Sequence, residues 1–431
     1  MKRLILSIVC VALSAMMAAQ NLRDCASLKI NSENGVYAKG ETVRVWADVK
    51  AVPSEPVILD IAKFGDSERT ETKTVNLHPG ENLLLESSYD EAVHYTMTLR
   101  CGDDGVEVTE NRLKTGFIVG TEDFRPGFEE PKDVLKYWKK EFRKMRKEKM
   151  VPVISKQSEK NGCKVYELEL NCVGPAPVRA YVAHPENAAK KSLPIFLYLH
   201  AAGSPGSPAA AKTAVSNAER GALSMDLNAH GMLNDQPKAY YDSLSAGPLK
   251  DYSKREPKDR DDYYFKWMLL RAQRALDYLM ADPLWDGKHI IVMGTSQGGG
   301  QSSFLAAMNP EVSAAVLTVP AMLDQGGIVA GRTTSWPHTM RKYPETSAEN
   351  SPYFDPGLIL KHTKAHIWCE IGLFDGTCPP ANLFSVLNTI QSEKTVLTWQ
   401  RAHHNNNFSA KEHSEVVGAS REAFIKSELV R

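Results

Sequence analysis

The sequence lacks a net charge and, beyond its first residues, lacks any long apolar run. Its 52 basic and 52 acidic side chains cancel across 431 residues, so no global field attracts nucleic acid or an anionic membrane surface. After the N-terminal stretch, no segment approaches the roughly 20 apolar residues that a spanning helix needs. We therefore expect a soluble protein with a small or neutral substrate, with no nucleic-acid partner and no membrane insertion.

The chain is also poor in cysteine. Seven cysteines are far from a disulfide framework, and the C-x-x-C and Cys/His spacings of zinc sites are absent. Disulfides Cys25–Cys101 and Cys163–Cys172 are conceivable in an exported chain. We expect neither a metal nor an organic cofactor.

The N-terminus has the layout of a signal peptide. Lys2 and Arg3 precede an apolar stretch from Leu4 to Leu13, and small residues follow near Ala18 and Ala19. We expect residues 1–19 to be cleaved on export to the periplasm or the extracellular space.

Residues 20–120 read as a small all-β, sandwich-like domain. Short alternating apolar segments at 41–47, 57–61 and 95–99 are separated by turn signals such as Asn34-Gly35 and Pro79-Gly80. Strands of this rhythm over about 100 residues are typical of β-sandwiches. No cluster of aromatic residues suggests sugar binding, so a structural spacer is the simpler interpretation.

Residues 121–431 have the sequence pattern of an α/β domain. A 3.6-residue apolar period predicts a helix over 261–280. Mostly apolar segments predict buried strands, and they lie at 166–170, 193–199, 222–227, 289–293, 314–319, 366–371 and 396–399. Alternation of strands with helices favours a doubly wound, mostly parallel sheet.

The sharpest motif is Gly294-Thr-Ser-Gln-Gly298, which lies between the predicted strand 289–293 and a predicted helix over 299–307. Strand, tight turn and helix form the context of a nucleophile elbow, in which flanking glycines make room for a strained serine. Ser296 is therefore the candidate nucleophile of an α/β-hydrolase fold.

A serine hydroxyl needs a base and a carboxylate that orients the base, and in this fold they follow in the order Ser, acid, His. Asp375 follows the strand 366–371, and His403 and His404 follow the last strand. Each feature alone has an ordinary explanation as a turn or a solvated loop. Their order after an elbow predicts that Asp375 is the acid and that one of the two histidines is the base.

The reaction also needs backbone N–H groups aimed at the oxyanion. The residue after the nucleophile, Gln297, supplies one, and a loop after an early strand supplies the other. His200-Ala-Ala-Gly203 is that loop, and Ala201 is the candidate donor, although the segment could also be a plain tight turn. Trp336 could stack on a sugar ring or belong to a cap or core.

From about residue 128 onward, the sequence resembles the acetyl xylan esterase and cephalosporin C deacetylase family of α/β-hydrolases. The resemblance rests on Gly294-Thr-Ser-Gln-Gly-Gly-Gly300, on Asp375-Gly-Thr-Cys-Pro-Pro380, and on family-like positions around 263–279, 319–320 and 324. It implies the roles given above for Ser296, Asp375, Gln297 and Ala201, and it favours His404 over His403.

Besides Ala201, which stands where the family often has an aromatic residue in the oxyanion loop, the chain departs from this family at two other places near the site. The family's Arg-Gly-Gln stretch is replaced by Asn228-Ala-His-Gly231, and its His-Glu pair becomes His404-Asn405. The first change puts loop packing and subunit assembly in question, and oligomer formation stays open.

The resemblance implies a secreted serine esterase that removes O-acetyl groups from xylan or acetylated xylo-oligosaccharides. Three alternatives remain: a glucuronoyl or feruloyl esterase, a serine peptidase of the prolyl-oligopeptidase type, and a non-catalytic glycan-binding protein. The intact Ser-Asp-His order argues against the last.

Overall fold

The computed structural model describes residues 21–53, 55–101, 112–203, 208–404 and 414–431. The predicted signal peptide, residues 1–19, lies outside these ranges. Within them, no helix combines the length and apolar character needed to cross a membrane.

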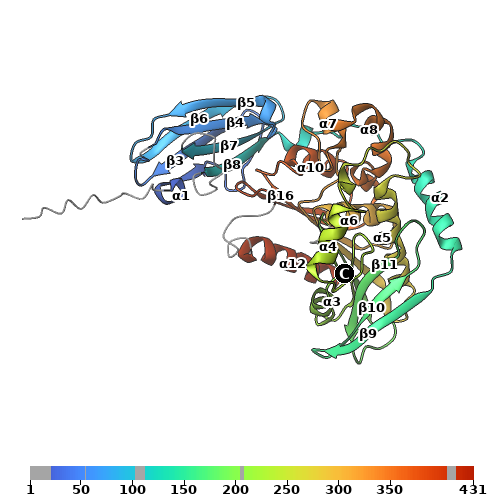
Figure 1. Cartoon of the computed structure of the whole chain (residues 1–431). Coiled ribbons are helices and arrows are strands. Elements are labelled where there is room, and N and C mark those ends of the chain that lie inside the picture. Colours follow the sequence, from blue (N-terminus) through green and yellow to red (C-terminus); the bar gives the residue numbers. More distant parts are fainter. Residues whose placement is uncertain (1–20, 54, 102–111, 204–207, 405–413) are drawn as a thin grey trace, which may run out of the picture.

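The described residues up to Val119 form two sheets, drawn in blue to teal in Figure 1. Alternate residues of β3 are buried, as expected for a strand with one face on a core, and they share that core with Met97 and Leu99 of β7. The strands predicted at 57–61 and 95–99 lie within β4 and β7, and that at 41–47 lies in β3 except for Glu41. The first sheet has the order β1-β3-β6 and the second β2-β8-β7-β4-β5. Their bounds are β1 (Ala26–Ile30), β2 (Val36–Tyr37), β3 (Thr42–Val49), β4 (Val57–Lys63), β5 (Thr70–Val75), β6 (Gly80–Ser88), β7 (Val93–Cys101) and β8 (Arg112–Val119), with α1 (Leu22–Cys25) in front.

A nine-stranded sheet occupies the rest of the chain, in the order β17-β16-β15-β14-β12-β13-β11-β10-β9. β12 to β17 are parallel to one another, whereas β9, β10 and β11 run antiparallel to their neighbours. The bounds are β9 (Pro152–Lys160), β10 (Cys163–Leu170), β11 (Val178–Pro185), β12 (Leu193–Leu199), β13 (Leu223–Leu227), β14 (Trp285–Thr295), β15 (Ala314–Thr318), β16 (His366–Gly372) and β17 (Lys394–Trp399). The sheet is therefore mostly parallel, as the sequence predicts.

Helices cover both faces of this sheet. Ile195 and Leu197 of β12 share a core with α2 (Val134–Lys147), α5 (Tyr264–Met280) and α6 (Gln297–Met308), whereas Phe196 between them packs on the side of α12 (Ala419–Glu428). α3 (Ala211–Ala218) also lies on that second side, against β10 and β11. Shorter helices lie in the connections: α4 (Lys238–Ala246), α7 (Thr339–Lys342), α8 (Pro344–Asn350), α9 (Pro356–Ile359), α10 (Pro380–Leu387) and η4 (Tyr252–Lys254). Because successive strand residues point to opposite faces, apolar strands without alternation are buried between two helical layers.

Three expectations differ in detail from the structure. β9 and β11 are additional strands that the sequence did not reveal. The long helix begins at Tyr264 rather than 261, because Asp261 lies before it and accepts a hydrogen bond from Lys266 Nζ at 2.7 Å. Neither conceivable disulfide is formed: Cys163 begins β10 while Cys172 lies past its end, and Cys25 and Cys101 are thiols.

Candidate active site

Ser296 stands at the sharp turn between β14 and α6. Its φ of 55° and ψ of −118° lie where a residue with a side chain is strained. The flanking glycines permit this turn, because a Cβ on Gly294 would lie 2.2 Å from Gly298 C, and one on Gly298 would lie 2.0 Å from Leu199 O. The G-x-S-x-G spacing thus follows from backbone segments that touch on both sides of the serine.

The structure brings Ser296, Asp375 and His404 into one hydrogen-bonded row. His404 Nδ1 lies 2.8 Å from Asp375 Oδ2, and His404 Nε2 lies 2.8 Å from Ser296 Oγ. Asp375 is 1% exposed, and its other oxygen accepts hydrogen bonds from the backbone N–H groups of Thr377 and Cys378, both at 2.8 Å. Of the two adjacent histidines, His404 makes both contacts.

The chemistry of the two end groups fixes the proton positions along this row. A carboxylate only accepts, so the Nδ1–H group of His404 donates to Asp375. Nε2 is then left as an acceptor for the Ser296 hydroxyl. This is the arrangement that lets an imidazole remove the proton of an attacking serine.

Gln297 and the loop of Ala201 lie beside the nucleophile. Gln297 is the first residue of α6 and is fully buried. The chain at Leu199 and His200 runs past Gly298, since a Cβ there would also lie 2.9 Å from His200 O. The two backbone segments that carry the expected oxyanion donors are therefore neighbours.

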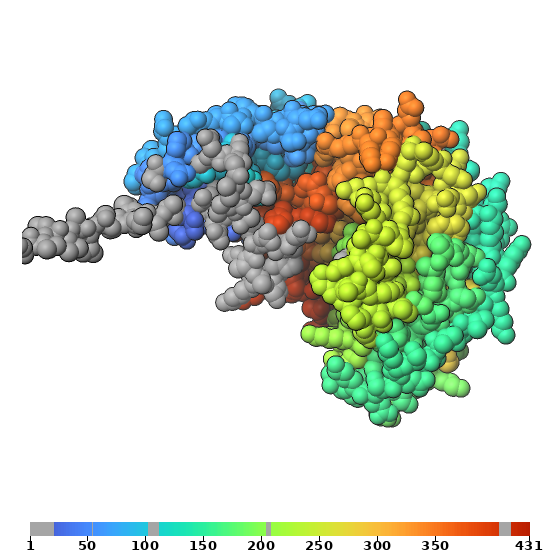
Figure 2. Space-filling view, in the orientation of Figure 1, coloured from blue at the N-terminus to red at the C-terminus, as the bar shows by residue number. Residues whose placement is uncertain are grey.

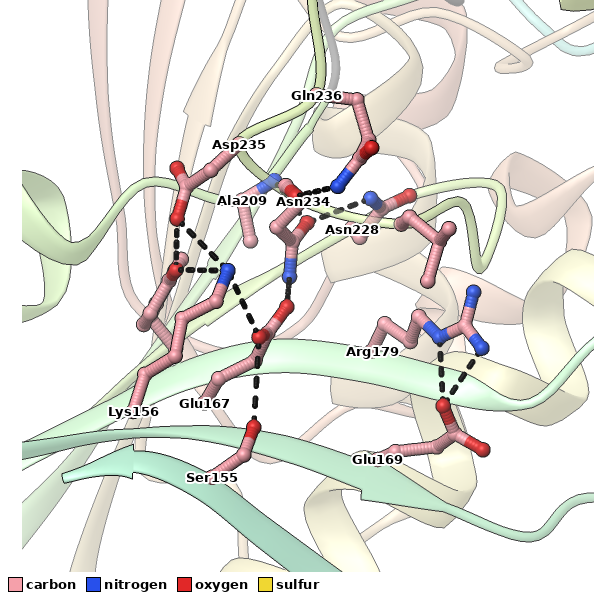
Figure 3. A network of polar contacts seen from close by, with 12 residues as sticks. Ser155, Lys156, Glu167, Glu169, Arg179, Ala209, Asn228, Asn234, Asp235 and Gln236 are labelled. Atoms are coloured by element: carbon pink, nitrogen blue, oxygen red, sulfur yellow. Dashed lines mark hydrogen bonds and ion pairs between the residues drawn. The ribbon is translucent and has the colours of Figure 1, made fainter. Parts of the chain in front are cut away.

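Polar contacts hold the chain at Ala209, just before α3. Asn234 Oδ1 accepts from Ala209 N at 3.1 Å and from Asn228 Nδ2 at 2.8 Å, while Asn234 Nδ2 donates to Glu167 at 3.0 Å. Figure 3 shows this network continuing to Lys156, which pairs with Glu167 at 3.0 Å. Asn228, in the stretch where the chain departs from the family, is thus part of the network that holds the chain before α3. The same network contacts β10 and β9 at the antiparallel edge of the sheet.

Tyr252 joins the two oxyanion segments directly. Its hydroxyl accepts from Gly203 N at 3.1 Å and donates to Gln297 Oε1 at 2.7 Å. The ring is buried against His230 and Tyr264, at centroid distances of 4.6 and 4.9 Å. No sequence motif marks this residue, which lies 45 positions before Gln297 in a connecting segment.

Two further side chains lie near the catalytic row. Trp336 is half-buried, and its ring packs edge-on against Phe265 with the ring centroids 5.6 Å apart. The backbone N–H of Trp336 donates to Thr377 O at 2.9 Å. No pattern in the sequence pointed to His338. Burial is the main cause that lowers the pKa of its imidazole, while the nearby charge of Asp375 raises that pKa and the charge of His404 lowers it. His338 Nδ1 lies 2.9 Å from Thr334 O, so this nitrogen donates to the chain that follows α6 and β15.

One group of potential metal ligands comes together in the described part of the chain: Asp375, Cys378 and His404. The carboxylate and imidazole of this group are hydrogen-bonded to each other, and the imidazole is also hydrogen-bonded to Ser296. Burial raises the pKa of the Cys378 thiol well above its usual value, which opposes the thiolate form that binds metals.

A cavity of 640 Å³ lies behind Tyr252, away from the catalytic row. His230 and Tyr264, which touch the Tyr252 ring, are among its lining residues, together with Tyr263, Trp267 and Arg271. Its walls come from α4, α5, the segment that joins them, the connection between β10 and β11, and the chain that follows β13.

Comparison with known proteins gives one consistent result. The family model described as acetyl xylan esterase (AXE1) matches residues 120–417. The acetyl esterase Axe7A of Xylanibacter ruminicola is 25% identical over 295 residues, which span 67% of this chain and 66% of that relative.

Two solved structures have the same fold. An acetyl xylan esterase from Paenibacillus sp. R4 aligns with a TM-score of 0.59 at 20% identity, over 70% of this chain and 98% of its own. Acetyl xylan esterase 1 from Thermoanaerobacterium sp. JW/SL YS485 aligns with a TM-score of 0.55 at 21% identity, over 68% and 95%. Since the family model covers well over half of the sequence, this protein is a carboxylic ester hydrolase of the α/β-hydrolase serine type and belongs to the acetyl xylan esterase family.

Proposed function

We propose that this protein is an exported serine esterase that removes O-acetyl groups from xylan or acetylated xylo-oligosaccharides. The observation that carries the proposal is the hydrogen-bonded row of Asp375, His404 and Ser296 at the carboxyl ends of the parallel strands. Membership of the acetyl xylan esterase family supports the choice of an acetyl ester of a sugar as substrate.

The proposed reaction has two acyl transfers. Ser296 Oγ attacks the acetyl carbonyl while His404 Nε2 takes its proton, and the backbone N–H groups of Gln297 and Ala201 stabilise the oxyanion. His404 then returns the proton to the departing sugar oxygen, which leaves an acetyl-serine. Water attacks this ester while His404 takes its proton, and the bond between the acetyl carbon and Ser296 Oγ breaks as His404 returns the proton to Oγ, which releases acetic acid that ionises to acetate. No cofactor takes part in these steps.

The carboxylate of Asp375 keeps the imidazole in the orientation that both steps need. Two backbone N–H groups hold that carboxylate in place. Its negative charge also stabilises the imidazolium that forms when His404 takes the serine proton.

Replacing the nucleophile tests the core of the proposal. We expect Ser296→Ala to lower kcat for acetate release from acetylated xylan by about 10⁴-fold or more. Ser303→Ala is the matched control, because Ser303 lies on the same helix and its hydroxyl donates to Gly299 O of that helix at 2.8 Å. Retained activity in Ser296→Ala would refute a serine mechanism.

The substrate class is separated from its alternatives by a panel of esters. We expect faster acetate release from acetylated xylo-oligosaccharides than cleavage of feruloyl or glucuronoyl esters, because the family acts on acetyl groups. Cleavage of short proline peptides would favour a peptidase, and an inert Ser296 toward a fluorophosphonate probe would favour a glycan-binding protein.

The remaining parts of the proposal concern the signal peptide, the domain bounds and the sugar-stacking residue. Residues 1–19 are proposed to direct export, residues 20–120 to form an appended sandwich-like domain, and residues 121–431 to form the catalytic domain. The start of the family match at residue 120 supports this boundary. Trp336, whose ring is only partly covered, is the proposed sugar-stacking residue.

A further inference from the structure

One face of strands β7 and β8 lies directly against the two loops of the proposed triad. His94 Nε2 of β7 is 2.7 Å from the carbonyl oxygen of Leu373, two residues before Asp375. Gly116 N of β8 donates to Gln400 O at 2.8 Å, four residues before His404. Figure 2 shows the blue N-terminal surface directly above the orange-red surface of the C-terminal third of the chain.

His94 is a buried hydrogen-bond donor with a fixed orientation. It is 0% exposed, and burial lowers its pKa to about 4, so the imidazole is neutral at neutral pH. Because a carbonyl oxygen only accepts, Nε2 carries the proton and donates to Leu373. Nδ1 has no hydrogen-bond partner among the described residues. Burying Nδ1 without a hydrogen-bond partner costs free energy. We attribute this cost to the hydrogen bond of Nε2, which fixes the loop at Leu373.

Gly116 allows the second strand to reach the same loop. It lies opposite Thr96 in the ladder of β7 and β8. A Cβ at this position would lie 2.1 Å from Leu373 O and 3.2 Å from Leu373 Cβ, which is far inside van der Waals contact. A glycine is therefore required where β8 passes the chain that leads to Asp375.

The loop of the base is held by the turn in front of β2. Thr398 Oγ1 donates to Asn34 O at 3.1 Å, and Gln400 Nε2 donates to Glu33 O at 3.4 Å. A Cβ on Gly35 of this turn would lie 2.5 Å from Leu373 Cδ1 and 3.1 Å from Gln400 Cβ. The turn thus touches the loops of the acid and of the base at once.

We propose that β7, β8 and the turn before β2 hold the loops of Asp375 and His404 in their catalytic position, and that His94 is a positioning residue of the reaction. The inference rests on the proposed triad. These contacts come from outside the part of the chain that matches the family model, which begins at residue 120. General-base catalysis depends on geometry at the level of an ångström, so a loop held from outside the catalytic domain sets the rate.

The test compares three variants of the full chain. His94→Leu removes the donor at similar size, and we expect kcat to fall about 10- to 100-fold with KM within twofold of the parent. His94→Gln can place an amide N–H at the same reach, and we expect it to restore most of the rate. Thr96→Val is the control, because Thr96 is buried on the same face of β7, and its rate stays near the parent's.

A double-mutant cycle separates positioning from general stability. If His94 acts through the loop of Asp375, His94→Leu costs little further activity in an Asp375→Asn background. Equal losses in both backgrounds, or a parental kcat in His94→Leu, would overturn the inference. If Ser296→Ala were fully active, the triad itself would fail, which is a different result.

Gly116→Ala provides a second route to the same answer. The added methyl group displaces Leu373 without leaving a buried polar group unpaired, and we expect a fall in kcat at an unchanged KM. All variants are assayed well below their measured unfolding midpoints. Should His94→Leu fail to fold, a parental kcat in Gly116→Ala would refute the inference.

Discussion

The two halves of the proposed active site are supported by different parts of the chain. On the oxyanion side, Gln297 and the Ala201 loop are joined by Tyr252, which lies within the part of the chain that matches the family model. On the acid–base side, the loops of Asp375 and His404 are held by β7, β8 and the turn before β2. The comparison supports the inference that β7, β8 and the turn before β2 position the half of the proposed site that moves protons.

Among the variants that test this comparison, the largest change in kcat is expected at the residue proposed as the general base. We expect His404→Ala to lower kcat about 10³-fold or more, because His404 contacts both Ser296 and Asp375. His403→Ala should change kcat only a fewfold, since His403 is half-buried and its neighbours include Lys114 of β8. Steady-state kinetics of the pair decide the question. A larger loss in His403→Ala would reverse the assignment.

A smaller effect is expected on the oxyanion side. Tyr252→Phe removes two hydrogen bonds that join Gly203 to Gln297, and we expect kcat to fall about tenfold with little change in KM. Tyr264→Phe is the matched control, since its hydroxyl bonds His230 at 2.6 Å in the same aromatic cluster. Affinity for a trifluoromethyl ketone that mimics the tetrahedral oxyanion should weaken in parallel with kcat/KM. Equal losses in both variants would mean that the cluster acts through packing alone.

The smallest expected effect is on the free energy of unfolding. It compares two buried histidines, His94 on the acid–base side of the site and His230 on the oxyanion side. Burial lowers the pKa of His94 to about 4 and that of His230 to about 3. An unfolded histidine binds a proton below about pH 6.5, whereas the folded ones do not. Protons therefore favour the unfolded chain, and the free energy of unfolding falls as pH drops from about 6.5 to 4.

Each histidine contributes about 3 kcal/mol to this loss, because one pKa unit corresponds to about 1.4 kcal/mol. Denaturant unfolding of the parent, His94→Gln and His230→Gln at pH 7, 5 and 4 measures it. We expect each variant to lose less stability on acidification than the parent does. An unchanged pH dependence would show that these imidazoles are not buried as described.

Much of the catalytic domain could be read from the sequence because its strands are buried on both faces. The segment 193–199 coincides with β12, and the elbow at Ser296 follows from strand, glycine spacing and helix. β9 could not be found in this way, because all nine of its residues are exposed and carry no apolar alternation. The structure places it at the sheet edge, where it pairs only with β10.

The supports of the site were beyond the reach of sequence patterns. Tyr252 contacts Gly203 and Gln297, which are 49 and 45 residues away, and His94 contacts Leu373, which is 279 residues away. Neither belongs to a motif, and a histidine within a strand has no special signal. The sequence identified the groups proposed to perform the chemistry, because their spacing reflects local backbone geometry, but the long-range contacts that hold them required the structure.

The missing side chain of Gly116 also bears on how the chain folds. β8 is synthesised more than 250 residues before the loop at Leu373, which must later fit against it without room for a methyl group. N-terminal sheets that form early during synthesis can therefore present a finished surface to that loop. A defect in these sheets would then appear as catalytic domains that are folded but low in activity, with a lower yield of competent enzyme from each synthesised chain.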